Sequence, residues 1–472
     1  MTSGSTAPER EPTREFARFI ATLDGGSLPR SVREHLQGAL LDTLRVASLG
    51  ERAPWSEWAR ALARDLGGRE RSTVLFGGGR TDPERATFVN ATYAGSLDAD
   101  DVHVGAMLHP GCVVIPAALA VGEAAGATGR EVIAAIAAGY ETMIRIALAI
   151  QPTHFRRGFQ STATCGVFGA AAAAASLLAR GADRETRIAG TLGLAASFSG
   201  GLTQFYHSGS TVKRIHAAHA AREGVHAAQL AAAGFDGPVD ILEGRDGYAR
   251  AYADGHDFSI ALDGLGSRWR LLETAVKPHA CSARVLSAIE AAATLAARHE
   301  VRWQDLSEVR VGIPAVIQGR LTSGSPSDLQ AAQMSLPFCV AMALVRGGWT
   351  DAGVALGLDD FDGALADPRV RDLAKRIVCE PDPEAEQAST AESVGARVTL
   401  AVGTGERWSL FVPAPAGSAS RPLALPDHRA RFARELARRC EPAALEALLE
   451  SVCTLESQPG VDDLLARLGE AR

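Results

Sequence analysis

Three carboxylates fall within four residues at Asp98, Asp100 and Asp101, and the pair His109-Pro110 follows shortly after. Carboxylates this close repel one another, which raises at least one pKa unless a cation or metal ion lies nearby. A histidine titrates near neutral pH, so His109 could donate or accept a proton while Asp98 fixes its tautomer or orients a lysine. The segment therefore predicts acid–base chemistry, the alternative being a solvated turn whose Asp side chains cap helices.

Lysine is rare in this chain. Only Lys213, Lys277 and Lys375 occur, so 45 of the 48 basic residues are arginine. Arginine keeps its proton near neutral pH, whereas lysine releases it when burial or a neighbouring cation lowers its pKa. Each lysine is thus a candidate for transferring a proton or stabilising negative charge, unless it has survived by chance on the surface.

Two other interpretations of the acidic segment remain open. Asp-x-Asp-Asp resembles the acid motif of class II terpene cyclases, but those enzymes need an aromatic-lined cavity and aromatic residues make up only 6% of the chain. A Mg²⁺ site is the other, but the sequence shows no second carboxylate cluster at a suitable spacing. No two of the seven cysteines have metal-ligand spacing either, so no metal site is predicted.

The elements that must position these residues fall into two regions. Apolar spacing and Ala-rich composition predict helices over most of 14–230. Residues 309–313, 396–402 and 408–412 alternate like strands, and 428–472 is helical again. We therefore predict a mainly α fold, with a large all-α domain over 1–264 and 413–472 and an inserted, smaller α+β lid domain over 265–412.

Composition excludes several classes of function. A net charge of −7 over 472 residues argues against nucleic acid as the main partner. The most apolar stretch, 132–150, contains Glu141 and Arg145, which are costly in hydrocarbon, so no membrane span is predicted. The N-terminus has no apolar run and the cysteine count is odd, so we expect a cytoplasmic protein with reduced thiols.

Several segments together resemble the MmgE/PrpD family, which includes 2-methylcitrate dehydratase, cis-aconitate decarboxylase and iminodisuccinate epimerase. The resemblance rests on LDADDVHVGAMLHPGCVVIPAALA, GYETMIRIALAI, TCGVFGAAAAAASLL, STVKRIHAAHAAREGVHAAQLAAAGFDGPVDILEG and KPHACSARV. It implies a helical domain with an α+β lid, a homodimer, and an active site between the domains that uses no metal and no organic cofactor. It also implies that Asp98, His109, Lys213 and Lys277 are the catalytic residues.

The departures from the family pattern concern the substrate pocket. Gln160 stands where the family has a histidine, and Gly95 replaces another histidine. Val102 replaces a threonine of the decarboxylase-like members, and Gln318 aligns with a lid tyrosine. A glutamine forms hydrogen bonds but does not titrate. Gln160, Gln318 and His103 are therefore predicted to bind substrate, and the substrate is expected to differ from those of the three named activities.

The surviving groups predict a cofactor-independent lyase. Without a metal, negative charge developing beside a carboxylate or carbonyl must be stabilised by fixed cations. We predict a cytoplasmic, bacterial, homodimeric dehydratase that deprotonates carbon in a small hydroxy acid or related carbonyl compound. The alternatives, in order, are an isomerase or epimerase, a decarboxylase, a non-catalytic anion-binding relative and, remotely, a class II terpene cyclase.

Overall fold

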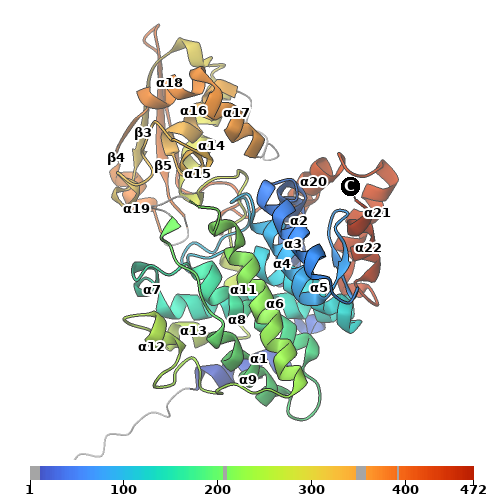
Figure 1. The fold of residues 1–472 in the computed structure, drawn as a ribbon. Helices are drawn as coiled ribbons and strands as arrows, with labels where there is room; N and C mark the ends of the chain where they lie inside the picture. Colours follow the sequence, from blue (N-terminus) through green and yellow to red (C-terminus); the bar gives the residue numbers. More distant parts are fainter. Residues whose placement is uncertain (1–10, 206–209, 347–357, 391–392, 472) are drawn as a thin grey trace, which may run out of the picture.

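The computed structural model describes residues 11–205, 210–346, 358–390 and 393–471 and divides them between a helical domain and a lid (Figure 1). The helical domain begins with α1 (Pro12–Thr22), α2 (Arg30–Gly50), α3 (Pro54–Leu66), the β1–β2 hairpin (Ser72–Val74, Gly79–Thr81) and α4 (Pro83–Gly95). It continues with α5 (Gly111–Ala125), α6 (Gly129–Ile150), α7 (Thr153–Arg156), α8 (Ser161–Leu178), α9 (Arg184–Ser197), α11 (Lys213–Ala233), α12 (Tyr248–Tyr252) and α13 (Phe258–Leu262). The C-terminal helices α20 (Leu425–Leu436), α21 (Pro442–Cys453) and α22 (Asp462–Glu470) belong to it as well. The prediction of a mainly α fold is confirmed.

Close packing of α8 against α6 and α11 forms the centre of this domain. Small residues make the approach possible: a Cβ on Gly224 would lie 2.5 Å from the Cβ of Ala170 and 2.6 Å from the carbonyl oxygen of Val167. The start of α6 is fixed by a capping box between Thr128 and Glu131. These helices form the rigid frame on which the acidic segment rests.

Helices α6 and α8 are long and apolar enough to span a membrane by length and composition alone. Their mean hydropathies are 1.6 and 1.4, and 94% of each tested window is buried within the protein. Neighbouring helices of the same domain cover them, as is typical of core helices.

The lid is an α+β unit with its own core. It contains α14 (Leu286–Arg298), β3 (Leu306–Ile313), α15 (Leu329–Gln333), α16 (Leu336–Arg346), α17 (Leu358–Ala366), α18 (Pro368–Arg376), β4 (Val378–Pro381), α19 (Pro383–Ala388), β5 (Ala396–Val402) and β6 (Arg407–Val412). The sheet order is β4-β3-β5-β6, with β3 parallel to β4 and the other neighbours antiparallel. The strands predicted at 396–402 and 408–412 are confirmed as β5 and β6, which form an antiparallel hairpin whose turn contains Gly405 at a φ of 96°.

The two hydrophobic cores are built from different parts of the chain. One combines residues from 16–271 with residues from 432–471, and the other lies almost wholly within 280–412. Val46, Leu97 and Ala99 of the helical domain also pack into the second core. The segment around the acidic motif therefore lies where the two domains meet, while the predicted boundaries at 264/265 and 412/413 stay predictions.

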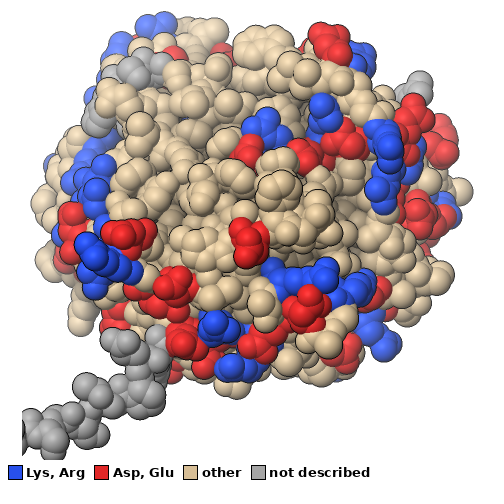
Figure 2. All heavy atoms as spheres, turned by 60° about the horizontal axis from the view of Figure 1, so that its bottom comes forward, with Lys and Arg blue, Asp and Glu red and all other residues tan. Residues whose placement is uncertain are grey.

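Figure 2 views the molecule from the lower end of the helical domain. A broad area at the centre of this face carries few charged side chains, and basic and acidic residues lie intermixed toward its edges. On this face, therefore, neither sign of charge forms an extended patch.

Candidate active site

The acidic segment is the loop between α4 and α5, and it is unusual in both conformation and burial. Asp98 has a φ of 59°, in the left-handed region that a non-glycine residue adopts only when its surroundings hold it there. Asp98, Asp100 and Asp101 are all buried. The alternative of a solvated turn is therefore wrong, because the lid and the neighbouring helices cover the loop.

The carboxylate of Asp98 lies between the two predicted lysines. Lys213, the first residue of α11, places its Nζ 3.0 Å from one oxygen, and Lys277 places its Nζ 2.8 Å from the other. Burial by itself would raise the pKa of Asp98, but the charges of Lys213 and Lys277 outweigh it and hold that pKa far below its usual range. Asp98 is thus an anion that fixes two cations.

The two lysines differ in access to solvent. The Lys277 side chain is 1% exposed, and its Nζ also lies 3.7 Å from Asp100. Burial lowers the pKa of Lys277, but the charges of Asp98 and Asp100 outweigh burial and raise the pKa above its ordinary value. The idea that its neighbours lower this pKa for proton transfer is therefore corrected: carboxylates, not the other cation, dominate around Lys277. Lys213, at 13% exposed, retains contact with solvent.

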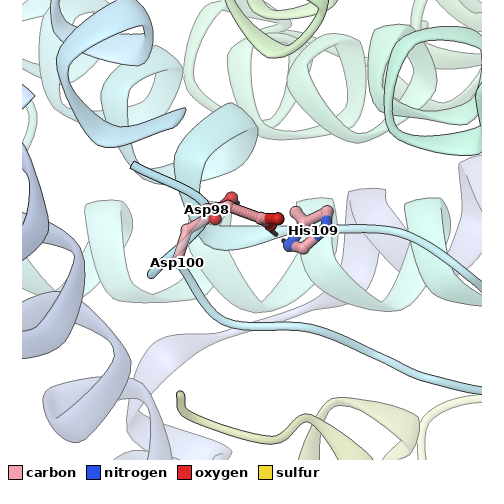
Figure 3. A group of neighbouring side chains, drawn as sticks. All are labelled: Asp98, Asp100 and His109. Atoms are coloured by element: carbon pink, nitrogen blue, oxygen red, sulfur yellow. Dashed lines mark ion pairs between the residues drawn. The ribbon is translucent and has the colours of Figure 1, made fainter. Parts of the chain in front are cut away.

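His109 lies beside Asp100 and Asp98 (Figure 3). Its Nδ1 is 2.8 Å from the carbonyl oxygen of Asp101 and 3.3 Å from the Asp100 carboxylate. Because a carbonyl oxygen only accepts hydrogen bonds, Nδ1 carries the proton and Nε2 carries the lone pair. Burial lowers the pKa of His109 despite the opposing charge of Asp100, so the ring is neutral at pH 7 and Nε2 can act as a base.

Asp101 holds the loop rather than a substrate. It accepts hydrogen bonds of 2.8 Å from the amide of Gly111 and from the hydroxyl of Tyr140. A Cβ at position 111 would lie 2.8 Å from the Asp101 oxygen, so only glycine allows this contact. Burial raises the pKa of Asp101 to about 7, with repulsion from Asp100 a smaller cause. The expected rise of one pKa is confirmed, although its main cause is burial.

The Lys277 segment is bonded to three separate parts of the chain, one of which is this loop. Val102 and Ala275 exchange two backbone hydrogen bonds of 2.8 Å, and Val276 donates to the carbonyl of Gly417, between β6 and α20. Arg431 of α20 donates to the carbonyl of Lys277 at 3.0 Å. Lys277 is therefore fixed by the acidic loop, the segment between β6 and α20, and helix α20 itself.

The three predicted substrate-binding residues occupy different environments. His103 accepts a hydrogen bond at Nδ1 from the Ala106 amide and places Nε2 3.4 Å from Glu273, so we assign it to holding the loop. Gln160 is half-buried and caps α8 through its side-chain oxygen, which accepts from the Ala163 amide at 2.7 Å. Gln318 is exposed on the lid. Substrate contact by Gln160 and Gln318 stays a prediction.

The cluster in Figure 3 also has the composition of a metal site, because ligand atoms of Asp98, Asp100 and His109 lie within 4.8 Å of one another. The fit is poor. Two ammonium groups already hold the Asp98 carboxylate, and one of them also faces Asp100. A divalent cation bound there would lie beside both ammonium groups at close range, with strong repulsion. The two ammonium groups are thus the cations that can stabilise negative charge at this site.

Sequence reasoning missed three residues that support the site. Asp100 contacts both Lys277 and His109, and its place in the acidic motif was a usable signal. Gln333 and Arg214 bond the backbone beside Asp98 from two separate elements. A lone glutamine at the end of a short helix carries no sequence signal for such a role.

The fold and site define a two-domain helical protein whose ionic cluster lies at the junction with an α+β lid. Residues 14–261 match the MmgE/PrpD N-terminal domain, and residues 279–456 match the MmgE/PrpD C-terminal domain. The chain therefore belongs to the MmgE/PrpD family. Its relatives in that family are lyase-type enzymes.

Curated relatives cover most of the chain. This chain is 26% identical to the cis-aconitate decarboxylase-like protein oryM of Aspergillus oryzae, over 99% of both chains. It is 26% identical to cis-aconitate decarboxylase of Aspergillus terreus, over 86% of this chain and 85% of the relative. It is 24% identical to the mouse cis-aconitate decarboxylase, over 94% and 90%.

Proposed function

We propose that this protein is a cofactor-independent dehydratase of a small hydroxy acid. The observation that carries the proposal is the state of His109. Its Nδ1 donates to the carbonyl of Asp101, and its lowered pKa leaves Nε2 unprotonated beside two cations. A neutral imidazole next to fixed positive charge suits removal of a proton from carbon.

The proposed reaction is a β-elimination. Nε2 of His109 takes a proton from the carbon next to the substrate carboxylate or carbonyl, and that electron pair forms the new C=C bond. The C–O bond on the neighbouring carbon breaks, and the hydroxyl leaves as water with a proton from the Lys213 ammonium. The proton on His109 returns to Lys213 through solvent, so atoms and charge balance over one turnover.

The two lysines have different roles in this proposal. Lys213 is partly exposed and uses one contact on Asp98, so it retains N–H donors for a substrate carboxylate or leaving hydroxyl. Lys277 is buried and remains charged, so it stabilises the developing enolate electrostatically. Asp98 keeps both ammonium groups at a fixed separation before substrate arrives.

Decarboxylation is the second candidate, and the names of the relatives favour it. There the C–C bond breaks, CO₂ leaves, and the carbon that keeps the electron pair must receive a proton. The neutral His109 ring carries no proton on Nε2, so the proton for that step would come from Lys213. Dehydration uses His109 in the protonation state that it already has.

The test is incubation in D₂O with cis-aconitate and, separately, with 2-methylcitrate and other β-hydroxy acids, followed by NMR and CO₂ detection. A new alkene without release of CO₂ supports dehydration. Release of CO₂ from cis-aconitate would instead identify the reaction as decarboxylation. Deuterium at carbon without net conversion indicates epimerisation, and no exchange with any acid contradicts enzymatic proton transfer. His109→Gln should abolish turnover and exchange, whereas the exposed control His256→Gln should not.

A further inference from the structure

Two backbone carbonyls next to Asp98 are held by residues from opposite domains. The guanidinium of Arg214, directly after Lys213, donates to the Ser96 carbonyl at 2.9 Å. The side-chain amide of Gln333, in the lid, donates to the Leu97 carbonyl at 2.7 Å. Arg214 also donates to the oxygen of the Gln333 side chain at 3.1 Å. The turn that leads into Asp98 is thus bonded on two successive carbonyls.

The same amide reaches the Lys277 segment. The nitrogen of Gln333 donates a second hydrogen bond of 2.7 Å to the carbonyl of Ala280, three residues beyond Lys277. One fully buried side chain therefore contacts the residue before Asp98, the residue after Lys213 and the segment that carries Lys277. It does so from the last residue of α15.

We propose that Gln333 is a positioning residue for the reaction: its amide clamps the three segments bearing Asp98, Lys213 and Lys277 and holds Asp98 in its left-handed conformation. The proposal rests on the proposed function for its effect on turnover, but the clamp itself is a geometric claim. It also gives the lid an indirect part in catalysis, because α15 supplies the clamp but does not contact the reacting atoms.

The chemistry of an amide fits this position better than any other side chain of that size. Two donors face two carbonyl oxygens, and one acceptor faces a cation, so every group of Gln333 is paired. A glutamate would keep the contact with Arg214 and lose both donors. It would also place a buried negative charge against two carbonyl oxygens, at a considerable cost.

The clamp also explains how the left-handed turn persists. A non-glycine residue at positive φ carries backbone strain, and such a conformation survives only where its surroundings over-determine it. Arg214 itself is buried and packs its guanidinium 4.9 Å from the ring of Trp55, so it is a fixed partner for Gln333. Without the amide, the turn is free to relax and the carboxylate of Asp98 to leave the lysines.

The first measurement does not depend on knowing the substrate. Because the chain has only three lysines, labelling with ¹³Cε-lysine gives three NMR signals, assigned with single Lys→Met variants. In Gln333→Met, Lys277 should titrate at a lower pH than in the wild type, since Asp98 no longer offsets its burial. The signal of Lys375, which is exposed on α18, should be the same in the variant and in the wild type.

The matched control is Gln330→Met, on the same helix one turn earlier, where the described residues show no side-chain hydrogen bond. With any acid that the wild type converts, Gln333→Met should lower kcat by about 10²-fold, as expected for misplaced catalytic groups. KM and the Gln330→Met variant should change little. Gln333→Asn, which adds no charge but shortens the reach of the amide by one methylene, replaces the first variant if that one fails to fold.

Unchanged titration of Lys277 in a folded Gln333 variant would overturn the clamp. If the titration midpoint of Lys277 falls in the variant but the wild type converts no acid, the clamp stands and the proposed dehydratase function fails. If the titration midpoint of Lys277 falls in the variant and kcat equals that of the wild type, the clamp exists but does not position the catalytic groups, and the proposal is wrong.

Discussion

Replacing Lys277 by methionine should destabilise the protein far more than replacing either other lysine. The Lys277 ammonium is 1% exposed and lies 2.8 Å from Asp98 and 3.7 Å from Asp100. Its removal leaves two buried carboxylates with less positive charge than they need, and breaking such a buried pair costs about 3–5 kcal/mol. Lys213→Met should cost less, because Lys213 is partly exposed and Lys277 still holds Asp98.

The penalty should depend on pH in a way that follows from the two pKa shifts. The pKa of Asp98 is depressed, so its stabilising contribution is present above about pH 3.9, its unfolded value, and is lost as pH falls below that. The pKa of Lys277 is raised, so its contribution is present below about pH 10.4 and is lost as pH rises further. Between these limits the cost of Lys277→Met should be constant.

The assay is thermal and urea unfolding followed by circular dichroism, with Lys375→Met as the matched control on an exposed lysine. Adding Asp98→Asn to Lys277→Met should recover about 0.5–3 kcal/mol of the loss, because it removes one unpaired charge. Turnover should fall by about 10²-fold or more in Lys213→Met and Lys277→Met. If Lys277→Met is no less stable than Lys375→Met, the buried cluster does not exist as described.

Four further outcomes are expected. The acid limb of the kcat/KM profile should have its midpoint below pH 6.5, because burial lowers the pKa of His109; a midpoint above 6.5 would contradict this. The melting temperature of Asp101→Asn minus that of the wild type should increase from pH 5 to pH 8. The pKa of Asp101 is raised to about 7, so the wild type loses stability as pH rises and the buried carboxyl group ionises. A difference in melting temperature that does not change with pH would contradict the raised pKa. Activity should survive prolonged EDTA treatment, and a loss that Mg²⁺ restores would reopen the metal interpretation of the acidic cluster. We propose a homodimer closed through the helical domain, whose lower face has few charges at its centre (Figure 2). Light scattering should therefore give twice the chain mass of 49.4 kDa. A mass of 49.4 kDa across the micromolar range would refute the dimer.

Much of the candidate site was readable from residue types and order. The sequence predicts Asp98, His109, Lys213 and Lys277 as site residues, because lysines are so few and because the surrounding segments resemble one family. The helices around them were also predictable, since long Ala-rich periodic segments are the most reliable sequence signal. Family membership needed only the order and spacing of these segments.

The chemical states of these residues depended on contacts between distant parts of the chain. Asp98 and Lys277 are 179 residues apart, and only folding brings their charges to 2.8 Å. The sequence suggested that one cation lowers the pKa of the other, whereas the carboxylates between them raise that of Lys277. A pKa is set by burial and by the nearest charges, and neither is a local property of the sequence.

The sequence by itself determined the family, the mainly α fold and the identity of the ionisable groups, because these follow from composition, periodicity and motif order. The tertiary structure alone decided which groups are charged, which nitrogen of His109 carries the proton, and how Gln333 joins the lid to the acidic loop. The physical reason is range: helix formation acts over a few residues, whereas electrostatics, burial and hydrogen bonding at this site act between segments that the chain separates by up to 236 residues.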